Sequence, residues 1–213
     1  MRILKQMLVL ASLMMATQAN AIPVSSGQTN VLLDVELLAS VGLTLSGVGG
    51  GTIVPGNLGP GSVAFSIIGT TTFQYTAGTF APFSGTIEHA GTVSFNANTL
   101  TVGNFTIGFD AARVSATTSG FFVADNVTFP GVALFDIGNP SSLVATAIDL
   151  TIAADLLVSA ELAGVLQNTA LTGVDVGDAL VEARSVAEPA TVMLLLAGTA
   201  LAGVARRRSK PGR

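Results

Sequence analysis

The chain has no cysteine and no tryptophan, and its 213 residues include one histidine and one tyrosine. The lack of cysteine excludes disulfides, thiolate catalysis and cysteine-ligated zinc, so stability must come from the core. A Ser-His-Asp site would need His89 as its base, and no Gly-x-Ser-x-Gly motif accompanies it. The acidic residues are scattered, so no pair is marked out for glycoside hydrolysis. We predict no catalytic residues and no enzymatic activity.

Basic residues are scarce between residues 22 and 185, where two arginines and no lysine stand against twelve acidic residues. Phosphate binding needs clustered Lys and Arg, so nucleic acid is not an expected partner. Divalent cations remain open as ligands. Asp175, Asp178 and Glu182 form the densest acidic group, but their spacing lacks the calcium-loop pattern. Solvated charge on a turn is the favoured interpretation, and no metal site is predicted.

The N-terminal residues 1–21 have the pattern of a secretory signal peptide. Two basic residues precede an apolar stretch, residues 7–16, that is too short to span a bilayer, and a small-residue site runs from Ala19 to Ala21. Cleavage after Ala21 is the first expectation, and cleavage after Ala19 is the alternative. The exported domain then covers residues 22–185.

Residues 186–213 form a second targeting segment. An apolar helix is expected over residues 190–205, followed by clustered basic residues that stay on the cytoplasmic side of the inner membrane. Sixteen helical residues reach roughly 24 Å, which is short of a hydrocarbon core of about 30 Å, so the span is marginal. The residues that mark this segment are Glu188, Pro189, Ala190, Arg206, Arg207 and Arg208.

Over Val186–Lys210 this segment resembles the PEP-CTERM sorting signal of exported proteins in Gram-negative bacteria that make exopolysaccharide. The family pattern is Val-Pro-Glu-Pro, an apolar helix and an arginine cluster, and Ala187 stands where the first proline is usual. The resemblance implies recognition of Glu188 and Pro189 by exosortase, a membrane-embedded enzyme, after a transient stay in the inner membrane. The protein would then pass to the cell surface or the extracellular matrix. An ordinary membrane anchor that is never processed is the alternative.

Hydrophobic alternation with a period of two dominates residues 22–185 and predicts an all-β, mainly antiparallel sandwich or barrel. One short helix is expected near residues 159–167, with Ser159 as its N-cap. The apolar alternation changes phase near Gly103 and Asn104, and a β-bulge at this point would explain the change. The expected strands cover 31–44, 63–68, 70–75, 86–95, 100–110, 113–118, 132–137, 143–152 and 171–183.

His89 shares a strand face with Ile87, Val93 and Phe95, and it is either a hydrogen-bonded core residue or a ligand contact. Residues 83–93 are similar to a segment of haem-transport-associated domains of exported bacterial proteins. That resemblance implies haem binding at His89. Tyr75 is the one tyrosine available as a further ligand, but its spacing from this segment is too short to match the tyrosine of those domains. The threonines in residues 70–72 and 99–101 suggest ice binding as a further alternative, but they form no regular repeat.

The sequence therefore predicts an exported, non-enzymatic protein of the cell surface or the biofilm matrix, with exosortase and exopolysaccharide as partners and no cofactor. An exported ligand-binding module for haem or a divalent cation is the alternative, and an ice-binding protein is a lesser one.

Overall fold

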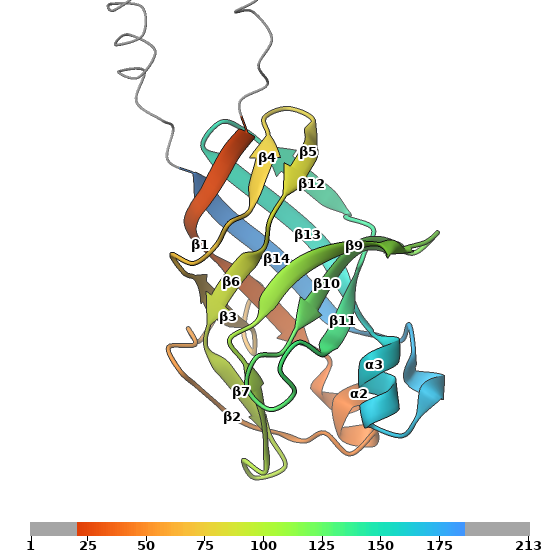
Figure 1. Ribbon diagram of the computed structural model, residues 1–213. Helices are drawn as coiled ribbons and strands as arrows, with labels where there is room; N and C mark the ends of the chain where they lie inside the picture. Colours follow the sequence, from red (N-terminus) through yellow and green to blue (C-terminus); the bar gives the residue numbers. More distant parts are fainter. Residues whose placement is uncertain (1–20, 186–213) are drawn as a thin grey trace, which may run out of the picture.

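The computed structural model of the chain describes residues 21–185 (Figure 1). Its elements in chain order are β1 (Ala21–Leu33), α2 (Val35–Ser40), β2 (Leu45–Gly49), β3 (Val63–Ile67), β4 (Gln74–Thr76), β5 (Phe80–Ser84), β6 (Ile87–Ala90), β7 (Thr92–Phe95), β8 (Leu100–Gly103), β9 (Thr106–Val114), β10 (Thr118–Ala124), β11 (Ala133–Gly138), β12 (Ser142–Ala145), β13 (Asp149–Val158), α3 (Ala160–Val165), the 3-10 turn η1 (Thr169–Leu171) and β14 (Asp175–Ser185).

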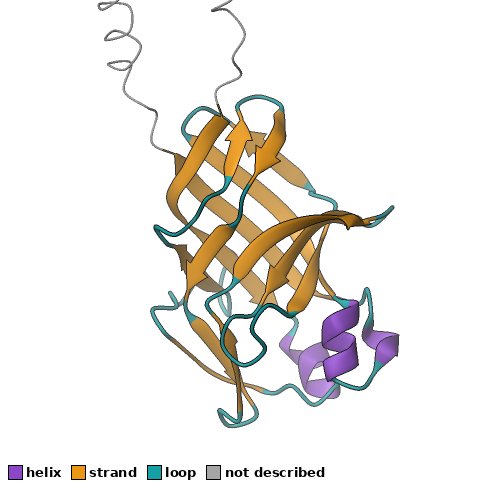
Figure 2. Ribbon diagram, in the orientation of Figure 1, coloured by secondary structure: helices purple, strands orange, loops and turns teal. Residues whose placement is uncertain are grey.

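Eight of these strands close into an antiparallel barrel. The order around the wall is β1, β14, β13, β11, β10, β9, β6 and β3, and β3 pairs again with β1. The longest ladders join β14 to β1 and to β13, and Figure 2 shows the strands wrapped around a common interior. The predicted all-β, antiparallel class is confirmed, in its barrel form.

Two extra ribbons extend the wall at one end of the barrel. Along one edge of β1, residues 28–31 pair with β3 and residues 21–23 pair with β4, which forms a hairpin with β5. Along one edge of β13, residues 156–158 pair with β11 and residues 150–153 pair with β12. Strands β5 and β12 are therefore the two edge strands of the sheet, and they lie near each other at the top of Figure 1. This end also holds the start of β1 and the end of β14, where Val24 pairs with Ser185.

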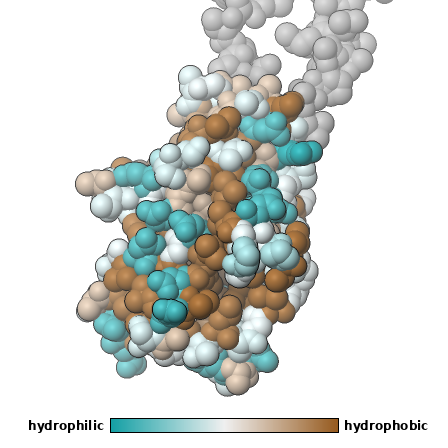
Figure 3. Space-filling view, turned by 180° about the vertical axis from the view of Figure 1, so that it is seen from behind, coloured by the Kyte–Doolittle hydropathy of each residue, from teal (hydrophilic) through white to brown (hydrophobic). Residues whose placement is uncertain are grey.

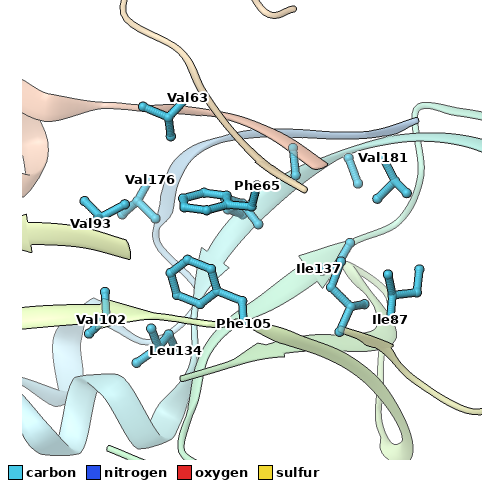
Figure 4. Close-up of a cluster of buried hydrophobic side chains, with 14 of the residues drawn as sticks. Val63, Phe65, Ile87, Val93, Val102, Phe105, Leu134, Ile137, Val176 and Val181 are labelled. Atoms are coloured by element: carbon cyan, nitrogen blue, oxygen red, sulfur yellow. The ribbon is translucent and has the colours of Figure 1, made fainter. Parts of the chain in front are cut away.

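The opposite end carries the small sheet β2-β7-β8 and the helices α2 and α3. A break at Gly91 sends β6 into the barrel and β7 into the small sheet. Gly91 has φ +128°, and a Cβ there would lie 2.8 Å from the Phe65 ring, so a side chain is excluded. In the core, the rings of Phe65 and Phe105 meet edge to face with centroids 4.9 Å apart (Figure 4).

Helix α3 confirms the predicted helix, and the Oγ of Ser159 accepts the Leu162 amide at 3.0 Å as its cap. A second helix, α2, was not predicted, and the expected strand over 31–44 is wrong beyond Leu33. The side chain of Asp34 accepts the Leu37 amide at 2.9 Å and so caps a helical turn at that point. Capping chemistry therefore overrides the apolar alternation in this stretch.

Three further strand predictions and the predicted bulge need correction. The expected strand over 70–75 is shorter and later, since β4 begins at Gln74. The stretch 113–118 is the tip of the β9–β10 hairpin, and 143–152 divides into β12 and β13. The expected bulge at Gly103 and Asn104 is instead a change of sheet, because Asn104 takes a φ of +47° between β8 and β9. The strand predictions at 63–68 and 132–137 match β3 and β11.

Candidate ligand-binding cavity

The barrel interior contains a cavity of about 100 Å³. It exists because inward-facing side chains from strands all around the wall leave space between them. Its lining is apolar except for Thr29, His89 and Ser119. A void with this lining favours apolar groups over water, which needs several polar partners.

Five phenylalanines gather at one side of this cavity. They are Phe73, Phe80, Phe83, Phe109 and Phe121, here called the phenylalanine cluster. Phe83 is central, with its ring centroid 4.9 Å from that of Phe109 and 5.0 Å from that of Phe121. Phe73, Phe80 and Phe121 line the cavity, whereas Phe109 is 40% exposed, so the cluster runs from the interior to the surface. Strand β5 and the β9–β10 hairpin bring these rings together from distant parts of the sequence.

His89 lies on β6 and is 2% exposed in the cavity wall. Its Nδ1 lies 3.0 Å from the Phe105 carbonyl oxygen, which can only accept, so Nδ1 carries the proton. Its Nε2 lies 2.7 Å from the Thr29 hydroxyl and accepts from it. Burial lowers the pKa of His89 to about 4, against the smaller opposing effects of the Phe105 hydrogen bond and the Glu88 charge. His89 is therefore a neutral core histidine with both ring nitrogens occupied.

The Thr29–His89 pair has the separation of a nucleophile and its base. A histidine with a pKa of about 4 is, however, a weak base near neutral pH. The group that orients its ring is a backbone carbonyl, which stabilises an imidazolium less than a carboxylate would. This geometry favours a structural role for the pair.

Tyr75, the second predicted ligand residue, is fully buried on β4 with a different set of partners. Its hydroxyl donates to the Thr146 carbonyl at 2.8 Å and lies 3.3 Å from the Ser185 hydroxyl. Tyr75 thus joins the β4 ribbon to the loop before β13 and to the end of β14. It does not line the cavity that His89 lines.

The acidic residues do not converge on a common point within residues 21–185. No group of three His, Asp or Glu side chains suited to a metal ion occurs in this part of the chain. Glu182 instead accepts from Asn30 at 2.8 Å and from Asn57 at 2.5 Å, which holds the loop around Asn57 against the barrel. Asp178 lies opposite Asp155 in the β13–β14 ladder.

The predicted sorting residues Glu188, Pro189, Ala190, Arg206, Arg207 and Arg208 lie outside the described residues, as does Ala19. Ala21, the other predicted cleavage residue, is the first residue of β1. Within residues 21–185, no helix is long and apolar enough to cross a membrane.

Sequence reasoning missed the phenylalanine cluster and Thr29. The available signal was the number of phenylalanines, eleven in a chain with one tyrosine and no tryptophan. Alternation places single side chains inward, but it does not tell which of them meet.

No family model matches the chain, and no curated protein sequence matches it. The fold is similar to a solved structure, the C-terminal domain of HtaA from Corynebacterium glutamicum, with 16% sequence identity and a TM-score of 0.46. The match covers 78% of this chain and 99% of that domain. The resemblance of the tail to PEP-CTERM signals stays a prediction.

Proposed function

We propose that residues 22–185 form an exported, non-catalytic binding module that holds a small apolar ligand inside the barrel, and that the C-terminal tail sorts this module to the cell surface or matrix. The apolar cavity of about 100 Å³ carries the proposal. Closed eight-stranded barrels have interiors of the right width to hold one small ligand. The phenylalanine cluster connects the surface to that interior through apolar side chains.

Haem and divalent cations are weaker ligand candidates than an apolar group. Pockets for drug-sized ligands measure about 300–1,000 Å³, so a cavity of about 100 Å³ suits a much smaller group or the end of a hydrocarbon chain. Both nitrogens of His89 are already hydrogen-bonded, and a ligand bond to either one would leave Thr29 or Phe105 without its partner. A cation would find no cluster of acidic side chains in the described part of the chain.

Benzene is a suitable probe, because a cavity of about 150 Å³ lined by apolar side chains binds it. We expect wild-type protein to bind benzene in a calorimetric titration. Ala154 lines the cavity, so Ala154→Leu should fill the space and abolish the heat of binding. Ala116→Leu, at the exposed β9–β10 tip, adds the same group outside the barrel and should bind as wild type does.

Circular dichroism of Ala154→Leu must show the wild-type strand spectrum, and Ala179→Val serves as a second filling variant. Wild-type protein that binds no benzene, or an Ala154→Leu variant that folds and binds it equally well, would contradict the proposed cavity function.

The sorting part of the proposal has its own test in a host that makes exosortase. Replacing Glu188 and Pro189 together by alanine should retain the protein in the inner membrane, since these two residues match the family motif. Thr191→Ala, just after the motif, is the neighbouring control and should leave delivery unchanged. Cell fractionation with intact-mass measurement gives the readout. Normal surface delivery of the double variant would count against sorting by this motif.

A further inference from the structure

The end of the barrel that carries both chain ends is held by a dense set of contacts. The amide of Ser185, the last residue of β14, donates to the Ile148 carbonyl at 2.9 Å, and its hydroxyl donates to the Ala147 carbonyl at 3.2 Å. The Tyr75 hydroxyl donates to Thr146 in the same turn. We call this turn, residues 146–148, together with β12 the apolar rim. The chain therefore leaves the barrel from a fixed point beside Ile148.

The sequence limits how far this rim can lie from a membrane. Only residues 186–191 separate Ser185 from the apolar run that begins at Val192. Six extended residues at about 3.5 Å each reach roughly 21 Å. While the apolar run is inserted in the bilayer, the rim must stay within about this distance of the surface, because the linker is too short to allow more.

The rim has the surface chemistry that suits a bilayer. Ile148 is 56% exposed, Val144 is 49% exposed and Leu143 is 41% exposed. The charged residues in the last rungs of the β13–β14 ladder are Asp149 and Arg184, which lie 3.9 Å apart and offset each other. Five acidic residues lie towards the other end of the barrel, namely Asp34, Glu36, Glu161, Asp175 and Asp178. Figure 3, seen from behind, shows apolar residues interspersed with polar ones on that face of the molecule.

The lining of the cavity reaches the surface at this rim. Strands β5 and β12 are edge strands, and one backbone hydrogen bond, from the Gly78 amide to the Ala145 carbonyl at 2.7 Å, joins their ribbons at the outer end. Leu143 of β12 lines the cavity and is also exposed. Phe80 of β5 and Phe121 of β10 line it from the other side. An apolar path thus connects the exposed rim with the barrel interior.

We propose that the apolar rim rests on the outer surface of the bilayer while the tail is inserted, and that the cavity takes the end of a membrane-lipid hydrocarbon chain through the opening between β5 and β12. This inference rests on the proposed binding function and names its ligand class. The lipid headgroup stays at the membrane surface, so the interior needs no charged partner, in agreement with its apolar lining.

The absence of cysteine allows a clean test on the exported chain, residues 22–213. Ile148→Cys and Val165→Cys are labelled with an environment-sensitive NBD group in phosphatidylethanolamine–phosphatidylglycerol vesicles. Val165 lies on α3, at the opposite end, and is 42% exposed, so it is the matched control. We expect a blue shift of the label at 148 and loss of its fluorescence with spin-labelled lipids, and neither effect at 165. A label at 148 that stays in water, or that equals the label at 165, overturns rim docking.

Lipid uptake is measured on the same chain by native mass spectrometry after extraction in mild detergent. The wild-type chain should carry a bound lipid, and Ala154→Leu should lose it while Ala116→Leu keeps it. No lipid on the wild-type chain overturns the uptake step. Benzene binding by that sample would then leave the cavity function standing, whereas its absence as well would remove the proposed function and leave only the docking result.

Discussion

Replacing Asp125 by asparagine is expected to lower the free energy of unfolding by about 2–4 kcal/mol, since buried amides left unpaired cost about 1–3 kcal/mol each. The Asp125 side chain is fully buried and accepts four backbone amides. Its Oδ1 accepts from Gly103 at 2.7 Å and from Val127 at 3.1 Å. Its Oδ2 accepts from Thr128 at 2.8 Å and from Phe129 at 2.6 Å. An asparagine amide would direct its own N–H groups at two of these donors.

Urea denaturation of the wild type and the variant measures this loss. Asp155→Asn is the matched control, because Asp155 is exposed and lies opposite Asp178 in the β13–β14 ladder. Removing one of two facing like charges should leave stability unchanged or slightly raise it. The account of Asp125 fails if both variants unfold at the wild-type urea midpoint. It holds if only Asp125→Asn is shifted, and that result would show how strongly this carboxylate joins the small sheet to the barrel.

The alternation around His89 predicted part of the site correctly. His89, Ile87, Val93 and Phe95 were placed on one face, and all four line the cavity. The same alternation did not reveal the break at Gly91, where the chain passes from the barrel into the small sheet. A period of two is preserved through such a break because each half still alternates. Continuous alternation therefore predicts which side chains share a face, but it does not predict whether the two halves of the stretch belong to the same sheet.

The partners within the site could not be predicted, because they depend on how the barrel closes. Thr29 lies sixty positions before His89, and the strand β3 between their strands brings them within 2.7 Å. The phenylalanine cluster likewise needs β5 to lie beside the β9–β10 hairpin, and the rings pair across that boundary. Registers of this kind follow from the whole sheet and leave no local signal in the chain.

Acid is expected to destabilise the protein through His89, by about 3 kcal/mol between pH 6.5 and pH 4. Burial lowers its pKa from 6.5 to about 4 in the folded state, so the unfolded state binds more protons throughout this interval. Stability then rises with pH by up to about 1.4 kcal/mol per pH unit up to pH 6.5, and this contribution is level above it. The contribution is present at neutral pH and is lost as the pH falls through about 4.

The His89→Gln variant isolates this effect from the titration of the carboxylates, which both proteins share. A glutamine amide can donate to the Phe105 carbonyl and accept from the Thr29 hydroxyl, so it retains both hydrogen-bonding roles without a titrating proton. Urea midpoints measured from pH 8 to pH 4 should show a steeper decline for the wild type below pH 6.5, and parallel curves would mean that His89 is not held neutral. Because Thr29 and His89 both line the cavity, protonation would also place a charge in an apolar wall. The folded protein gains this proton only near pH 4, so benzene affinity of the wild type should hold down to about pH 5 and decline as the pH approaches 4, and it should remain constant in His89→Gln. Stability and affinity therefore respond to the same histidine over different pH ranges, because the first also depends on the unfolded state.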